Sequence, residues 1–299
     1  MALREFWQAE ARAGEVIQQH RVSALPVDPF AIAKSESILC REFEAIAPGM
    51  SGCLMKVGDR FGIFYSDRFA SDGFRRFTVS HELGHYFLPG HTEYLFSRGN
   101  EQHDSESGFV SDDRYEREAD TFAAALLMPE ELFKNICAQA KPGLSAVETL
   151  SAQCGTSLTA TAIRYAKLSD DPITVVCSKD NRVQFTFMSD SLRARRGLTW
   201  IVKNSGIPEG TATFRFNREP KNVAQAKRVT SSSTMDAWFD CGGNLEVVEE
   251  VVGLGSYGRT LTVLWGESFP DPEEEDEERE ENDLGNMLPS DRWRQPRED

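Results

Sequence analysis

The sequence predicts an α+β protein of two domains, because its first half carries helical periodicity and its second half carries strand periodicity. Over residues 77–88 apolar side chains recur at helical spacing, and Pro89 and Gly90 end the pattern. In the second half apolar side chains alternate instead, as in Val183, Phe185 and Phe187. A length of 299 residues also suits two domains.

The individual elements follow from local patterns. A hairpin is expected over 51–57 and 61–65, joined at Gly58-Asp59, and a second long helix over 114–128. A helix, a tight glycine turn and another helix are expected over 150–165. After Asp170-Asp171-Pro172 come strands around an Asp180-Asn181 turn, further strands at 211–216, 245–252 and 260–265, and short helices at 189–199 and 221–228.

A motif with metal-ligand spacing, His-Glu-Leu-Gly-His, occupies residues 81–85. Helical residues four apart share a face, so His81 and His85 present two imidazoles to one ion. Glu82 lies about 100° around the helix from His81, where its carboxylate reaches a water at the open position of the ion. Zinc lowers the pKa of such a water to roughly 7, and Glu82 can then accept its proton. The motif therefore predicts a zinc hydrolase.

Histidine is otherwise rare in this chain. Of five histidines, four fall within 23 residues, at positions 81, 85, 91 and 103. The plain alternative is an amphipathic helix that happens to carry two histidines. The clustering favours the metal site.

Two residues compete as the third ligand. His91 has the offset used by peptidases with three histidine ligands, but their chain-bending glycine is replaced by Leu88. Glu116, on the second predicted helix, is the stronger candidate. Asp120 lies one turn along on the same face, where it can accept a hydrogen bond from a ligating histidine. Glu118 points elsewhere and is expected to be a solvated charge or a surface salt-bridge partner.

Two stretches of the sequence carry a family resemblance. The first is residues 76–85, which end in the His-Glu-Leu-Gly-His motif, and the second is residues 116–129, which begin at Glu116 and end at Met128-Pro129. They resemble the ImmA/IrrE metallopeptidases. The resemblance covers residues 1–168 and implies a minimal gluzincin-type domain of helices and a small sheet. It also implies that Zn²⁺ is held by His81, His85 and Glu116, with Glu82 as catalytic base. The acidic loop 94–113 departs from the family pattern and is expected to reshape the cleft.

The resemblance also implies a function, because characterised members of the family cut helix-turn-helix repressors inside bacterial cells. We therefore expect an intracellular zinc endopeptidase that cleaves such a repressor and derepresses stress, DNA-damage or phage-defence genes. One alternative is a non-proteolytic regulator that binds DNA or a ligand, and another is a toxin-like partner of an antitoxin repressor. The intact Glu82 favours the enzyme.

Cleavage of a repressor is irreversible, so the resting enzyme must be kept inactive. The sequence offers two candidates for the part of the chain that controls its activity. The alternating pattern of residues 172–270 is similar in architecture to GAF/PAS-type sensory domains. Cys53 is the other candidate, because a thiolate facing the cleft would occupy the open zinc position; the alternative is an ordinary strand cysteine. His91 and Tyr86 are candidates for stabilising the oxyanion.

The net charge of −15 is unevenly distributed. Residues 271–299 hold 13 acidic side chains and four arginines, which predicts a disordered tail that is solubilising or, alternatively, mimics nucleic acid. Residues 179–228 hold 11 basic and four acidic side chains interleaved with aromatic rings, a composition used to bind single strands. Single-stranded DNA is therefore a candidate activator. The alternative is that the aromatic side chains belong to the core and the basic side chains simply face solvent. The candidate anion-binding residues are Arg193, Arg195, Arg196, Arg215 and Arg218.

The predicted domains are a zinc metallopeptidase domain (1–142), a helix-turn-helix-like linker (143–171), a GAF/PAS-like sensory domain (172–270) and the tail (271–299). The second helix of the linker offers only Arg164 and Lys167 to phosphates, which favours packing over DNA binding. The N-terminus has no apolar signal region, and no apolar run reaches 18 residues. We therefore expect a cytoplasmic protein with no membrane partner.

Overall fold

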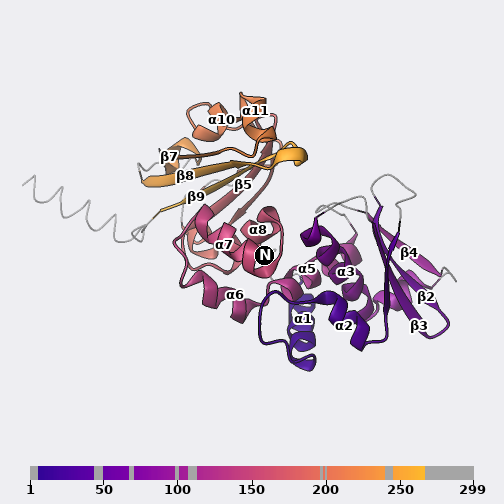
Figure 1. Cartoon of the computed structure of the whole chain (residues 1–299). Coiled ribbons are helices and arrows are strands. Elements are labelled where there is room, and N and C mark those ends of the chain that lie inside the picture. Colours follow the sequence, from indigo (N-terminus) through magenta and orange to yellow (C-terminus); the bar gives the residue numbers. More distant parts are fainter. Residues whose placement is uncertain are drawn as a thin grey trace, which may run out of the picture.

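The computed structural model describes residues 6–43, 50–66, 71–97, 101–106, 113–195, 198, 201–239 and 245–266. Over these residues the chain is a mixed α+β fold with two separate sheets, as predicted (Figure 1). The predicted tail 271–299 and Arg196 lie outside the described residues. No helix in the described ranges is long and apolar enough to cross a membrane.

The first sheet has the strand order β1-β3-β2-β4. Its strands are β1 (Leu39–Phe43), β2 (Met50–Val57), β3 (Arg60–Ser66) and β4 (Gln102–Glu106). The predicted hairpin is confirmed as the antiparallel pair β2–β3, and Gly58 takes the positive φ of +61° that its turn requires. β4 pairs antiparallel with β2 and lies at an edge of the sheet.

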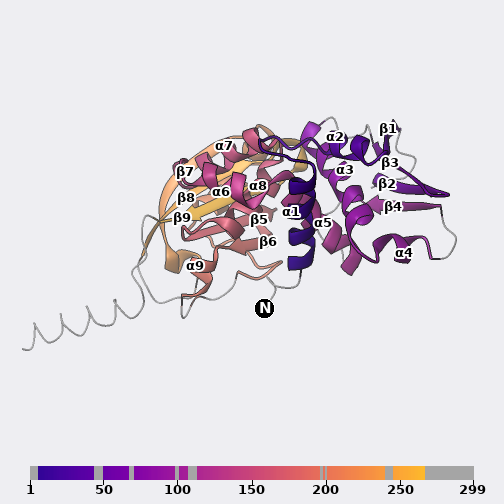
Figure 2. The ribbon, with the colours of Figure 1, turned by 90° about the horizontal axis from the view of Figure 1, so that it is seen from below.

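The helices of the first half pack against this sheet and one another. They are α1 (Trp7–Gln19), α2 (Pro29–Ser35), α3 (Asp72–Phe87), α4 (His91–Leu95) and α5 (Arg114–Leu127). Leu54 and Ile63 from the sheet share a core with Val79 and Leu83 of α3. Helices α1 and α5 lie side by side (Figure 2). The apolar side of α3 is therefore buried against the sheet, and α5 packs along another side of α3.

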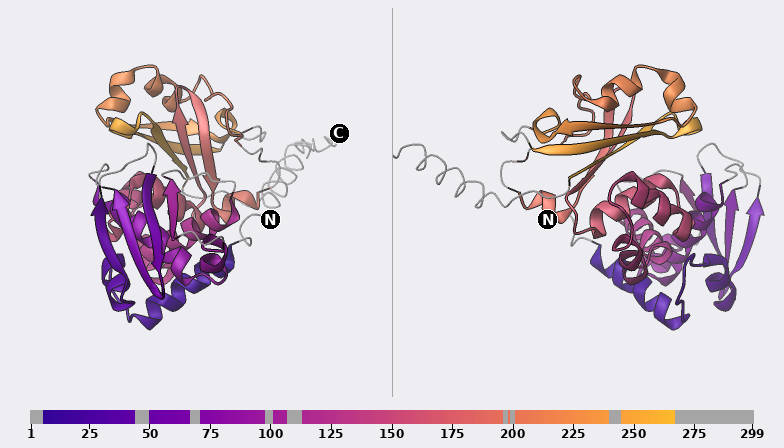
Figure 3. Two further views of the ribbon diagram at one scale, coloured as in Figure 1. Left: turned by 90° about the vertical axis from the view of Figure 1, so that its right-hand side faces the viewer. Right: turned by 60° about the vertical axis from the view of Figure 1, so that its left-hand side comes forward.

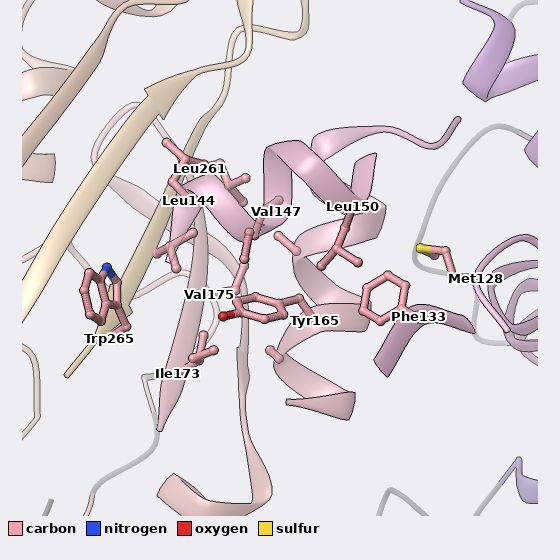
Figure 4. Close-up of a cluster of buried hydrophobic side chains, with 14 of the residues drawn as sticks. Met128, Phe133, Leu144, Val147, Leu150, Tyr165, Ile173, Val175, Leu261 and Trp265 are labelled. Atoms are coloured by element: carbon pink, nitrogen blue, oxygen red, sulfur yellow. The ribbon is translucent and has the colours of Figure 1, made fainter. Parts of the chain in front are cut away.

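Three helices, α6 (Glu130–Cys137), α7 (Leu144–Cys154) and α8 (Leu158–Leu168), lie between the first half and the second sheet (Figure 3). Gly155, with φ of +64°, makes the predicted turn between α7 and α8. Figure 4 shows how Tyr165 and Val147 from these helices meet Val175 and Leu261 from the second sheet. Helix α8 packs on this sheet, so the helix-turn-helix-like pair is a packed connector.

The second sheet is antiparallel, with the order β6-β5-β9-β8-β7. Its strands are β5 (Ile173–Lys179), β6 (Arg182–Met188), β7 (Arg228–Thr234), β8 (Glu246–Gly253) and β9 (Thr260–Trp265). One face meets α7 and α8; the other meets α10 (Ala212–Asn217) and is joined by α9 (Asp190–Arg193) and α11 (Pro220–Ala224). Strands β5 and β9 are buried on both faces.

The prediction of a strand at 211–216 was wrong, because this segment forms α10. The Thr211 hydroxyl accepts a hydrogen bond from the Phe214 amide, and buried Glu249 of β8 accepts from the Ala212 and Thr213 amides. These caps stabilise a helix despite the β-branched residues. The prediction of a helix reaching residue 228 was also wrong, since α11 ends at Ala224 and Arg228 begins edge strand β7.

Candidate metal centre

Helix α3 carries two histidines whose rings face one point. His81 and His85 lie one turn apart, and their Nε2 atoms are 3.0 Å from each other. Gly84, between them, lets α5 approach closely, because a Cβ at this position would lie 3.1 Å from the Cα of Ala119. The close packing of α3 on α5 therefore brings the two predicted motifs together.

Glu116, in the first turn of α5, completes this group. Its carboxylate oxygens lie 3.3 Å from Nε2 of His81 and 3.3 Å from Nε2 of His85. Burial would raise the pKa of Glu116, but hydrogen bonds from His103, His81 and His85 outweigh burial and hold that pKa far below its usual range. Among the described residues, His81, His85 and Glu116 form the group of potential ligands whose donor atoms all lie within 4.8 Å of one another.

Each histidine also has an outer partner at its other ring nitrogen. Nδ1 of His81 lies 2.9 Å from Oδ1 of Asp120, as the sequence predicts for a group that orients a ligand. Nδ1 of His85 lies 3.1 Å from Nδ1 of His91. His91 in turn contacts Glu118, 3.0 Å from its Nε2. His91 thus lies behind His85 and not among the three clustered groups. Glu118 contacts His91 and also forms the predicted kind of surface salt bridge, with Arg114 at 2.8 Å.

Glu82 lies next to the cluster, buried and close to the imidazoles of His81 and His103. Its side chain is 0% exposed, and neither carboxylate oxygen has a hydrogen-bond partner among the described residues. Burial raises the pKa of Glu82 to about 7, although the charge of His81 opposes this shift. Gly52 of β2 leaves room for the carboxylate, because a Cβ at this position would lie 3.1 Å from Oε1 of Glu82. A buried, unpaired carboxylate is costly, which is typical of a functional group.

The donor set fits zinc. Two imidazole nitrogens and one carboxylate are a common ligand set of catalytic zinc sites, which keep a further position open. Burial lowers the pKa of His85 to about 3, whereas burial of His81 is outweighed by its hydrogen bonds with Asp120 and Glu116, which raise its pKa to about 10. A ligating ring must be neutral, so His81 would release a proton when a metal binds. Because the Nδ1 atoms of both histidines are engaged elsewhere, their Nε2 atoms can turn lone pairs toward a shared cation.

Comparison with known proteins agrees with the motif. Residues 56–165, which include both clustered helices, match the IrrE N-terminal-like domain of a peptidase family. This part of the chain is an IrrE N-terminal-like domain. No curated protein matches the chain.

The fold is also similar to a solved structure, a Mycobacterium tuberculosis transcriptional regulator, with a TM-score of 0.55. The two share 11% sequence identity, and the match covers 86% of this chain and 76% of the other. At this identity the likeness concerns the fold alone. Its extent shows that the shared architecture continues well beyond the IrrE N-terminal-like domain.

Two other predicted residues in the first half of the chain, Cys53 and Tyr86, do not join the cluster. Cys53 alternates along β2 with Leu54, which packs into the core with α3, so the thiol belongs to the opposite face of the sheet. Burial and the nearby Glu82 raise the pKa of Cys53 to about 12, which disfavours the thiolate that a zinc ligand requires. The hydroxyl of Tyr86 points to Glu36 near α2, at 3.4 Å.

The candidate anion-binding arginines are divided between two elements beyond this domain. Arg193 and Arg195 lie on and just after α9, whereas Arg215 and Arg218 lie on and just after α10. Helix α10 packs on β7, β8 and β9, while α9 follows β6 at the other edge of the sheet. The described arginines therefore do not form one cluster.

The third-ligand assignment leads to a prediction about zinc content. Glu116→Ala is expected to abolish stoichiometric zinc binding, because it removes one of three ligands. His91→Ala should weaken zinc binding only about 10–100-fold, the usual effect of losing an outer hydrogen-bond partner. Metal analysis after dialysis and competition with a chelator would measure both. His20→Ala is the control, since that ring contacts Ser35 away from the cluster; greater zinc loss in His91→Ala than in Glu116→Ala would contradict the assignment.

Proposed function

We propose that the chain is a cytoplasmic zinc endopeptidase that cleaves a helix-turn-helix transcriptional repressor and so derepresses stress, DNA-damage or phage-defence genes. The observation that carries this proposal is the meeting of His81, His85 and Glu116 beside the buried, unpaired carboxylate of Glu82. A purely structural zinc site has no need of that carboxylate. The ImmA/IrrE resemblance supports a repressor as the substrate.

The roles of the residues follow from their positions. His81, His85 and Glu116 would hold the zinc, while Asp120 and His91 keep the two rings in their orientations. When bound, zinc polarises a water and the substrate carbonyl. Glu82 takes the proton of the attacking water on a carboxylate oxygen and delivers it to the amide nitrogen that leaves.

The second sheet is proposed to gate this reaction as a GAF/PAS-like sensory domain, and α7 offers a physical connection. At the N-terminus of α7, Glu250 of β8 accepts hydrogen bonds from the Leu144 amide at 2.7 Å and from the Trp265 indole at 2.7 Å. At its C-terminus, Arg76 of α3 donates to the Cys154 carbonyl at 3.2 Å. Movement of the second sheet would therefore reach, through one helix, the helix that carries His81.

A non-proteolytic regulator is the second candidate function. It is favoured by the fold similarity to a protein described as a transcriptional regulator. However, α8, the second helix of the helix-turn-helix-like pair, packs on β5 and β6 and buries Thr161, Ala162 and Tyr165. A recognition helix needs an exposed face for the major groove. The connector is thus poorly suited to read DNA in that way.

The decisive experiment mixes the full-length protein with the repressor encoded beside its gene, with and without a short single-stranded oligonucleotide. Cleavage is followed by gel electrophoresis and mass spectrometry, with Glu82→Gln as the inactive comparison and casein as a test of general proteolysis. Cleavage that needs Glu82 and the oligonucleotide would support the gated peptidase with DNA as signal. Cleavage without the oligonucleotide would remove DNA as the trigger, and casein degradation would favour a toxin-like protease. No cleavage by the zinc-loaded protein would favour the binding regulator.

A further inference from the structure

His103 is a fourth histidine at the centre that neither the motif nor the family resemblance assigns. It comes from edge strand β4 of the first sheet and not from either motif helix. Its Nε2 lies 2.9 Å from Oε1 of Glu116, and its ring centroid is 4.9 Å from that of His85. Its side chain is 22% exposed, so the contact with Glu116 is largely sheltered from water.

The pairing of β4 explains why His103 points inward. His103 pairs with Leu54 and Ser105 pairs with Gly52, and these partners lie on the face of β2 that packs on α3. Alternation along the strand leaves Gln102 and Asp104 exposed on the other face. The inward face of β4 thus carries His103 and the 2% exposed Ser105. The segment that departs from the family pattern therefore contributes a side chain to the centre.

The geometry points to His103 as the positioning residue of Glu116, an inference that rests on the proposed zinc site. An imidazole N–H that donates to Oε1 fixes one carboxylate oxygen and leaves the other, Oε2, free to bind the metal. With this contact, each of the three ligands has its own outer partner: Asp120 for His81, His91 for His85, and His103 for Glu116.

Glu116 needs such a partner more than the histidines do. It lies in the first turn of α5, and its side chain is 19% exposed, against 8% for His81 and 0% for His85. A long side chain at a helix end has more rotamer freedom to lose on binding a metal. A hydrogen bond from a paired strand removes part of that freedom beforehand, so metal affinity depends on the pairing of β4 with β2.

The test measures zinc affinity in the full-length protein, without substrate. His103→Ala should weaken zinc binding about 10–100-fold in competition with a chelator. His103→Gln should recover most of the affinity, because its amide N–H can still donate to Glu116. Gln102→Ala, on the exposed face of the same strand, is the matched control and should bind zinc like the unaltered protein. The visible absorption spectrum of the Co²⁺-substituted protein should change for His103→Ala and not for the control.

Several outcomes would overturn the inference. One is that His103→Ala binds zinc within about twofold of the affinity of the unaltered protein. Another is that His103→Gln binds zinc as weakly as His103→Ala. A lower melting temperature of metal-free His103→Ala, with normal cobalt spectra, would assign His103 to folding instead. Because none of these measurements requires cleavage, the inference and the peptidase function fail separately. A protein that binds zinc through His103 but cuts no repressor would refute only the function.

Discussion

Replacing Glu82 by glutamine is expected to lower kcat/KM for repressor cleavage by about 10²–10⁴-fold, the usual contribution of a general base. The amide cannot accept the proton of the attacking water. Zinc content should stay the same, because Glu82 is not one of the three clustered ligand groups. Glutamine also has nearly the shape of glutamate, so it should fit under Gly52 without moving α3. Stability should not fall, since the substitution removes a buried carboxylate that has no hydrogen-bond partner among the described residues.

The measurement is a time course of cleavage at several substrate concentrations, together with metal analysis of the same samples. Glu130→Gln is the matched control, because Glu130 lies on α6 and forms a surface ion pair with Lys134. This variant should cut at the normal rate. Unchanged cleavage by Glu82→Gln would refute the assigned mechanism, and loss of zinc in that variant would mean that Glu82 supports the metal instead.

The part of the centre that lies on two helices could be predicted from the sequence because helical spacing is local. His81, Glu82 and His85 lie within five residues, and Glu116 and Asp120 lie one turn apart on α5. Their geometric relation then follows from the packing of α3 on α5, which apolar periodicity anticipates. The structure brings His81, His85, Glu116 and Asp120 together as that reasoning expected, while their roles remain predictions.

The contribution of β4 could not be predicted, because it depends on long-range pairing. The strand reads Gln-His-Asp-Ser-Glu and has no apolar residue to mark an inward face. Only its register with β2 turns His103 toward Glu116. His91 shows a related limit: the sequence offered its spacing from His85 as evidence for a ligand, but the turn at Gly90, with φ of +83°, places His91 behind that ring. A histidine near a motif is thus a candidate whose role depends on tertiary structure.

The second half was less predictable for a similar reason. Alternating apolar residues correctly predicted β5, β6, β8 and β9, which are covered on at least one face. Strand β7, Arg-Val-Thr-Ser-Ser-Ser-Thr, lies at an exposed edge, so it lacks that pattern. The segment at 211–216 became a helix because buried Glu249, 36 or 37 residues away, accepts its first amides. The sensory role of this half stays a prediction.

The junction between the two halves depends on one glycine. Gly143 precedes α7 with φ of +93° and ψ of −152°, a conformation that is essentially restricted to glycine. A Cβ at this position would collide with Oε2 of Glu250 and with the Trp265 indole. The same Glu250 oxygen accepts the hydrogen bonds from Leu144 and Trp265. The missing side chain thus allows the second sheet to cap α7.

Gly143→Ala is therefore expected to destabilise the fold by about 2–5 kcal/mol, from backbone strain and from the displaced Glu250 contacts. The thermal unfolding midpoint would show this loss, and Gly210→Ala, where a Cβ meets nothing within 4 Å, should leave the midpoint unchanged. Glu250→Ala removes one collision partner together with its hydrogen bonds, so the two substitutions share one contact and their effects should not add. The double variant should therefore lose less free energy of unfolding than the sum of the losses in the two single variants. A fully additive pair would mean that strain at Gly143 acts independently of the Glu250 contacts.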